Sequence, residues 1–143
     1  MIGVVIATHG DLAKGFHHAT KMFFGETTNI ETIGLQLEDS ADDFQANLEE
    51  LIKKVDSGEG VVVLTDLNGG TPFNRSLMSM SNLSNKMEVL SGVNLPMIMD
   101  TINHQMLGTS LEETVESIVQ VATEGIAVAS LMFVTADDED DDF

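Results

Sequence analysis

The sequence predicts an α/β protein built on a single doubly wound, mainly parallel sheet with helices on both faces. Short apolar runs alternate with longer segments of helical periodicity, and turns rich in glycine separate most of them. Several of the short runs are apolar throughout rather than alternating, which is typical of strands covered on both faces. The 143 residues fit one domain, which we expect to span residues 1–135.

The first strand is predicted from Ile2 to Ala7, a run of β-branched and small apolar residues that ends at Thr8-His9-Gly10. A helix follows, with Asp11 as its expected N-cap and Gly25 as its stop. Helical spacing places four apolar residues on the stripe expected to face the core: Leu12, Phe16, Ala19 and Phe23.

The same alternation of strand and helix then repeats. A second strand is predicted over Ile30 to Leu37, and Ser40 caps a helix that ends before Gly58 with the stripe Phe44, Leu48, Leu51 and Val55. A third buried strand, Gly60 to Thr65, stops at Asp66 before a glycine-rich turn. Pro72 then suits the first position of another helix.

The last third of the chain contains one short strand and two helices by the same criteria. The strand is predicted at Met87 to Leu90, and a helical stretch follows to about Leu107. Ser110 and Glu113 form a capping box, and the helix that they begin is expected to bury Val115, Ile118, Val119 and Ala122. The final apolar run, Ala127 to Val134, fits either a strand or the end of a helix.

Composition excludes several classes of function. The net charge of −18 disfavours binding to nucleic acid, and the absence of cysteine excludes disulfides and thiolate chemistry. We expect a cytoplasmic protein, because the sequence contains neither a membrane span nor a secretory signal. Residues 136–143 are acidic, and we expect them to form a disordered tail.

His9 and Asp66 are the candidate catalytic residues. They follow the first and third strands, and in doubly wound sheets the carboxyl ends of those strands border the crevice where strand order reverses. A carboxylate that accepts one imidazole N–H fixes the tautomer and leaves the other nitrogen free to attack phosphorus. The pair therefore predicts a histidine that receives and returns a phosphoryl group.

The turns beside these two residues provide candidate donors for that phosphoryl group. The amides of Gly10 and Asp11 open one helix, and Gly69, Gly70 and Thr71 precede another. The Thr71 hydroxyl can donate as well. No cofactor and no metal is required for this chemistry.

Four other polar residues are expected to lie outside the site. The residues around His17, His18 and His104 form no metal-binding motif, and we expect structural or solvent-facing roles for all three. Arg75, the only arginine, follows the glycine-rich turn closely enough to touch a phosphate, but the sequence favours a solvated helix residue.

Three ordered motifs resemble the mannose-family enzyme IIA domain of the phosphoenolpyruvate-dependent sugar phosphotransferase system. The resemblance runs from Met1 to about Val134. The motifs are Thr8-His9-Gly10 with Ala13 and Gly15, the run from Thr65 to Asn74, and the run from Gly92 to Met97. Family members often have serine where Thr71 stands, which preserves the hydroxyl donor.

The resemblance implies that His9 accepts phosphate from the phosphocarrier HPr and passes it to a histidine of the enzyme IIB component. Membrane subunits IIC and IID would be served indirectly. It also implies a homodimer in which a C-terminal strand, here Ala127 to Val134, is exchanged between subunits. Some family members continue into a fused enzyme IIB domain, whereas this chain ends in an acidic tail, so we expect it to act as a separate subunit.

Two other functions use the same crevice. One is a flavodoxin-like domain that holds a phosphorylated cofactor, although the absence of Trp and Tyr disfavours flavin. The other is a regulatory module that uses phosphorylation of His9 to change partners. The sugar itself is not encoded here, because a phosphoryl carrier meets proteins rather than the sugar.

Overall fold

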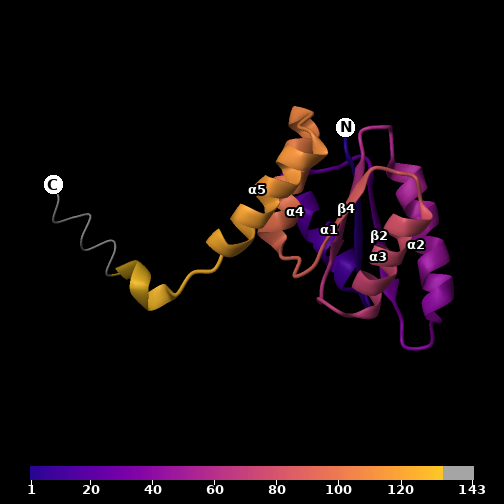
Figure 1. The fold of residues 1–143 in the computed structure, drawn as a ribbon. Helices are drawn as coiled ribbons and strands as arrows, with labels where there is room; N and C mark the ends of the chain where they lie inside the picture. Colours follow the sequence, from indigo (N-terminus) through magenta and orange to yellow (C-terminus); the bar gives the residue numbers. More distant parts are fainter. Residues whose placement is uncertain (134–143) are drawn as a thin grey trace.

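The computed structural model describes residues 1–133, which form a four-stranded parallel sheet flanked by helices (Figure 1). The predicted α/β fold is confirmed, and every predicted strand and helix up to residue 124 is present. The elements in chain order are β1 (Gly3–His9), α1 (Leu12–Phe24), β2 (Ile30–Leu35), α2 (Ala41–Val55), β3 (Val61–Thr65), α3 (Thr71–Asn82), β4 (Met87–Leu90), α4 (Leu95–Leu107) and α5 (Leu111–Glu124).

The strand order places β1 and β3 side by side in the centre of the sheet. The order is β2-β1-β3-β4, with all neighbours parallel. The chain first moves outward from β1 to β2 and then crosses back to β3, so the order reverses between β1 and β3 as predicted. Because Ala7 pairs with Thr65, His9 and Asp66 leave the sheet at the same edge.

Helices cover the two faces of the sheet in two layers (Figure 1). Helices α1, α4 and α5 pack on one face and α2 and α3 on the other, each layer with its own apolar core. Alternate residues of the central strands serve the two layers: Val4, Ile6, Val62 and Leu64 face the first, and Val5, Ala7, Val61 and Val63 the second.

The buried face of α1 differs from the predicted stripe. Phe16 packs against the core as predicted, but Leu12 and Phe23 are 47% and 60% exposed, whereas Ala13 and Thr20 are buried. The stripe was misplaced because the buried face includes a polar residue, which a search for apolar periodicity passes over. The Thr20 hydroxyl is satisfied by donating to the His17 carbonyl at 2.7 Å.

Helix α5 shows the same kind of difference. Ile118 is buried and Val115 and Ala122 pack against the core as predicted, but Val119 is 57% exposed. Thr114 is fully buried instead, and its hydroxyl donates to the Ser110 carbonyl at 2.7 Å. The predicted N-cap is confirmed, since the Ser110 hydroxyl accepts from the Glu113 N–H.

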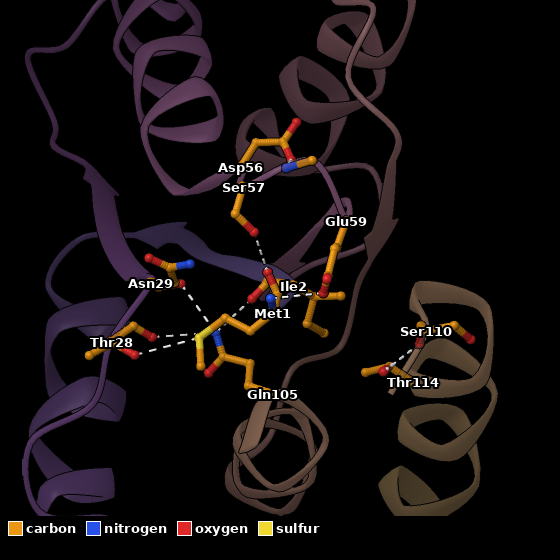
Figure 2. Close-up of polar contacts among 11 residues, drawn as sticks. Met1, Ile2, Thr28, Asn29, Asp56, Ser57, Glu59, Gln105, Ser110 and Thr114 are labelled. Carbon is orange, nitrogen blue, oxygen red and sulfur yellow. Dashed lines mark hydrogen bonds and ion pairs between the residues drawn. The ribbon is translucent and has the colours of Figure 1, made fainter. Parts of the chain in front are cut away.

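A polar cluster closes the edge of the sheet where β1 begins (Figure 2). The buried side chain of Gln105 on α4 donates from Nε2 to the Ile2 carbonyl at 2.9 Å and the Asn29 carbonyl at 3.3 Å. The N-terminal amino group of Met1 pairs with Glu59 at 2.8 Å. The Gln105 contacts fasten α4 to the residues just before β1 and β2, at the edge opposite His9.

The segment after α5 leads away from the sheet (Figure 1). Residues 129–133 are helical, so within the described part of the chain the last apolar run is helix rather than strand. Exchange of a strand requires a second copy and stays a prediction. The expected acidic tail, residues 136–143, lies outside the described residues. No helix in residues 1–133 is long and apolar enough to cross a membrane.

Candidate functional site

His9 and Asp66 lie in direct contact at the carboxyl ends of β1 and β3. Nδ1 of His9 is 3.0 Å from Oδ2 of Asp66 and 3.2 Å from Oδ1. The backbone N–H of His9 donates to the same Oδ2 at 3.0 Å, so one carboxylate holds both the ring and its backbone. Since an ionised carboxylate only accepts hydrogen bonds, the proton of the neutral imidazole belongs on Nδ1 and the lone pair on Nε2.

The two side chains differ in their access to solvent. The imidazole is 45% exposed, whereas the carboxylate is only 14% exposed. The partly covered carboxylate is thus held in place while the ring remains open to a large partner. This combination suits a nucleophile that reacts with a group presented by another molecule.

Gly70 forms a close wall beside the imidazole. A Cβ atom at this position would stand 2.8 Å from Cε1 of His9 and 3.4 Å from Nε2. Real Cβ contacts are longer than the first of these distances, so only glycine leaves room for the ring in this position. The glycine-rich turn after β3 therefore positions the ring, in addition to any role in binding an anion.

The five predicted phosphate-binding residues all lie in the two turns next to His9, but their amides are not equally available. The N–H of Gly10 donates to the Leu35 carbonyl at 2.8 Å, and the N–H of Gly70 donates to the Leu67 carbonyl at 3.0 Å. Among the described residues, no hydrogen bond occupies the N–H groups of Asp11, Gly69 and Thr71. The Thr71 hydroxyl is likewise without a partner in this part of the chain.

The N-terminal end of α1 is capped differently from the sequence prediction. Asp11 makes no side-chain capping bond. The buried hydroxyl of Thr8 instead accepts the Ala13 N–H at 2.8 Å, and it also donates to the His9 carbonyl at 3.2 Å. Thr8 therefore ties the last residues of β1 to the first turn of α1 on either side of His9.

The connection between β2 and α2, which sequence reasoning missed, forms another wall of the site. Nε2 of Gln36 donates to the Asp11 carboxylate at 3.1 Å, and the N–H of Gln36 donates to Asp39 at 2.8 Å. A hollow of about 350 Å³ lies here, lined by His9, Gly10, Leu35, Gln36, Leu37 and Asp39. The parallel topology could have indicated that this connection lies beside His9, because β2 ends at the same edge of the sheet as β1.

The remaining histidines and the single arginine do not contact His9. Burial lowers the pKa of His17, with a further contribution from Lys21, and its ring contacts Thr27 rather than the site. The His104 ring lies against Asp100 and Thr109, between α4 and α5.

Arg75 points to α2. Its guanidinium donates to Asp42 at 2.7 Å and to Gln45 at 3.0 Å. The only arginine is thus already paired on the face that carries α2 and α3. We therefore assign it no contact with a phosphoryl group on His9.

Residues 3–119 match the family model of the PTS system fructose IIA component. The mannose-specific EIIAB component of Escherichia coli K12 is 30% identical over 125 residues, which cover 87% of this chain but only 38% of that protein. The fructose-specific EIIA component of Bacillus subtilis 168 is 27% identical over 103 residues, or 72% of this chain and 70% of the relative.

The fold agrees with solved structures of the same kind. The crystal structure of the EIIA component of Streptococcus agalactiae superposes with a TM-score of 0.84 at 28% sequence identity. The match covers 92% of this chain and 99% of that chain. The matched family segment contains both His9 and Asp66. The chain therefore belongs to the enzyme IIA family of the sugar phosphotransferase system represented by the PTS system fructose IIA component.

Proposed function

We propose that this protein accepts a phosphoryl group from phospho-HPr on Nε2 of His9 and transfers it to a histidine of an enzyme IIB component. The observation that carries the proposal is the contact of Nδ1 with the Asp66 carboxylate at 3.0 Å, which leaves Nε2 as the nucleophile. Membership of a phosphotransferase-system family supports the same role.

The transfer is a displacement at phosphorus between two histidines. The Nε2 lone pair of His9 attacks the phosphorus, the P–N bond to the donor histidine breaks, and the electron pair returns to the donor nitrogen. Asp66 keeps the Nδ1 proton in place and stabilises the positive charge that develops on the ring. Transfer to enzyme IIB reverses the roles, with His9 as the leaving group.

The phosphoryl oxygens would be held by donors that are still unused. The N–H groups of Asp11, Gly69 and Thr71 and the Thr71 hydroxyl have no partner among the described residues. Thr71 opens α3, and the first residues of a helix favour anions through free N–H groups and the helix dipole. Gly10 and Gly70 are assigned to shaping the site, because their amides are already used.

The test is phosphorylation from phosphoenolpyruvate through purified enzyme I and HPr, followed by mass spectrometry of the intact protein. We expect one acid-labile phosphoryl group that is lost in His9→Ala and retained when His17, His18 or His104 is replaced. Label that survives the loss of His9 would contradict the proposal. Onward transfer to purified enzyme IIB then separates a carrier from a purely regulatory phosphohistidine module.

Replacement of the orienting carboxylate tests the mechanism. Asp66→Asn keeps the shape of the side chain but introduces an N–H₂ donor, and only its one carbonyl oxygen can then accept from His9. We expect the rate of phosphorylation to fall by about 10²-fold or more, with the fold unchanged by circular dichroism. An Asp66→Asn protein that is phosphorylated at the normal rate would exclude Asp66 from the reaction.

A further inference from the structure

Leu37 is the most exposed of the large apolar residues in the described chain. Its relative exposure is 106%, and it lies in the connection between β2 and α2 that lines the hollow beside His9. Such exposure leaves a leucine fully hydrated, and isolated cases need no special explanation. Leu37 differs from an ordinary exposed leucine in its position beside His9, in the bracing of its turn and in the residues around it.

The connection that carries Leu37 is braced on both sides. The Leu35 carbonyl accepts the Gly10 N–H at 2.8 Å, and the Gln36 amide group reaches the Asp11 carboxylate at 3.1 Å. Asp39 closes the other side, because its carboxylate accepts from the Gln36 N–H and its own N–H donates to the Gln36 carbonyl. Leu37 is therefore presented in a preorganised position, which lowers the entropy cost of binding.

Two further leucines are exposed at the same edge of the sheet. Leu12 follows β1 and is 47% exposed, and Leu67 follows β3 and is 59% exposed. Because the strand order is β2-β1-β3, the three connections are neighbours and His9 belongs to the central one. Each of these three connections thus exposes one leucine, and we call Leu12, Leu37 and Leu67 together the leucine rim.

The side of the leucine rim toward α2 is acidic. Residues 36–43 contain four carboxylates, Glu38, Asp39, Asp42 and Asp43, and no lysine or arginine, although Arg75 of α3 pairs with Asp42 at 2.7 Å. A second copy of this chain fits this surface poorly, because it carries the same carboxylates and a net charge of −18. A partner with basic residues around an apolar depression is complementary to it.

We propose that Leu37 is the hydrophobic anchor onto which the phosphoryl-donating protein docks, with Glu38 and its acidic neighbours steering a basic partner surface. This inference rests on the proposed function, since it assigns a binding role to the surface around the phosphoryl-accepting histidine. An apolar side chain on a braced turn, next to the reactive group and bordered by charge, has the composition of an interface centre with a polar rim.

The test compares Leu37→Ser with Leu107→Ser, a change at a leucine that is 77% exposed at the last residue of α4, on the opposite edge of the sheet. We expect Leu37→Ser to raise the KM for phospho-HPr by about tenfold with little change in the maximal rate, because one buried leucine is lost from the complex. Leu107→Ser should remain within about twofold of the unmodified protein, since it removes no apolar contact from this surface. A normal KM for Leu37→Ser would overturn the inference.

A small donor separates docking from chemistry. Phosphoramidate can phosphorylate an exposed histidine without a protein interface, so it should label the unmodified protein and Leu37→Ser at equal rates. An equal loss with phosphoramidate would show that the turn acts on His9 itself, which would overturn the docking role. Failure of both donors to label the unmodified protein would instead contradict the proposed function, and the docking role with it.

The steering role of the acidic residues near Leu37 can be tested separately. Glu38→Gln removes one exposed carboxylate, and we expect the KM for phospho-HPr to rise by about two- to threefold at low ionic strength. The effect should vanish near 0.5 M salt, where screening shortens the Debye length to a few ångströms. A salt-independent KM for the unmodified protein would exclude steering by these carboxylates.

Discussion

The imidazole of His9 is positioned from two sides by groups of different kinds. Asp66 holds Nδ1 by hydrogen bonding, and the backbone at Gly70 limits the ring by contact, since a Cβ there would stand 2.8 Å from Cε1. Hydrogen bonding sets the tautomer and contact restricts the ring position. Both are needed if Nε2 is to face a donor in line with the breaking bond.

Gly70→Ala should therefore impair transfer without unfolding the protein. The added methyl group displaces the ring from Asp66, and we expect a fall of about 10²-fold in the rate of phosphorylation by phospho-HPr. Gly15→Ala is the matched control, because Gly15 is inside α1 with nothing within 4 Å of an added Cβ. It should retain the normal rate and be more stable by about 0.5–1 kcal/mol in thermal or urea unfolding. Equal rates in both variants would contradict a positioning role for Gly70.

At this scale the sequence predicted the contact between His9 and Asp66 but not its surroundings. His9 and Asp66 could be brought together from topology alone, because parallel neighbours end at one edge and Asp66 directly follows β3. The use of the Gly10 and Gly70 amides by the Leu35 and Leu67 carbonyls could not be predicted. Such bonds depend on the exact path of each turn, which residue type does not determine.

Among the secondary-structure elements, strands were more predictable than the faces of helices. The four strands carry continuous apolar runs or short β-branched segments, and their bounds agree with prediction to within about two residues. Helices α1 and α5 instead bury threonines that satisfy their hydroxyls on backbone carbonyls. Apolar periodicity cannot reveal a buried polar residue whose partner lies in its own helix.

Gln105 illustrates how one polar side chain can join three elements. Its amide group donates to the carbonyls just before β1 and β2 (Figure 2). Its relative exposure is only 3%. Gln105→Ala leaves the Ile2 carbonyl without this donor, and we expect unfolding by urea to show a loss of about 1–3 kcal/mol. Gln120→Ala on α5 is the control, since the Gln120 side chain donates to Glu124 near the end of its own helix and joins no second element by a hydrogen bond among the described residues. It should change stability by less than about 0.5 kcal/mol.

The molecule as a whole presents an edge strand and an exposed apolar segment within residues 1–133. Strand β4 lies at an edge of the sheet, with one side unpaired. The segment after α5 exposes apolar side chains that have little cover from the rest of the chain, with Val128 at 56% and Phe133 at 74%. Edge strands and exposed apolar segments are the features that strand addition between two copies would bury.

We therefore predict a dimer in which the C-terminal segment of each copy pairs with the other. Sedimentation equilibrium should give twice the chain mass, and Phe133→Asp should shift the equilibrium toward monomer by placing a charge in the buried contact. Met22→Asp, at a residue 82% exposed near the end of α1, should leave the dimer intact. A monomer at all concentrations would refute the prediction. A single chain cannot reveal this arrangement, which is why sequence pattern left the last run open between strand and helix.

The fixed register between β1 and β3 holds His9 at one place on the edge of the sheet. His9 is attached to a strand whose preceding six residues, from Gly3 to Thr8, are completely or almost completely buried, so it has no flexible arm with which to search for its partners. If His9 carries a phosphoryl group as proposed, each group must wait for the donor protein to leave and for the acceptor protein to take its place. The rate of this step would then depend on how often the proteins meet and how quickly they separate, and it would scale with the abundance of the carrier and its partners.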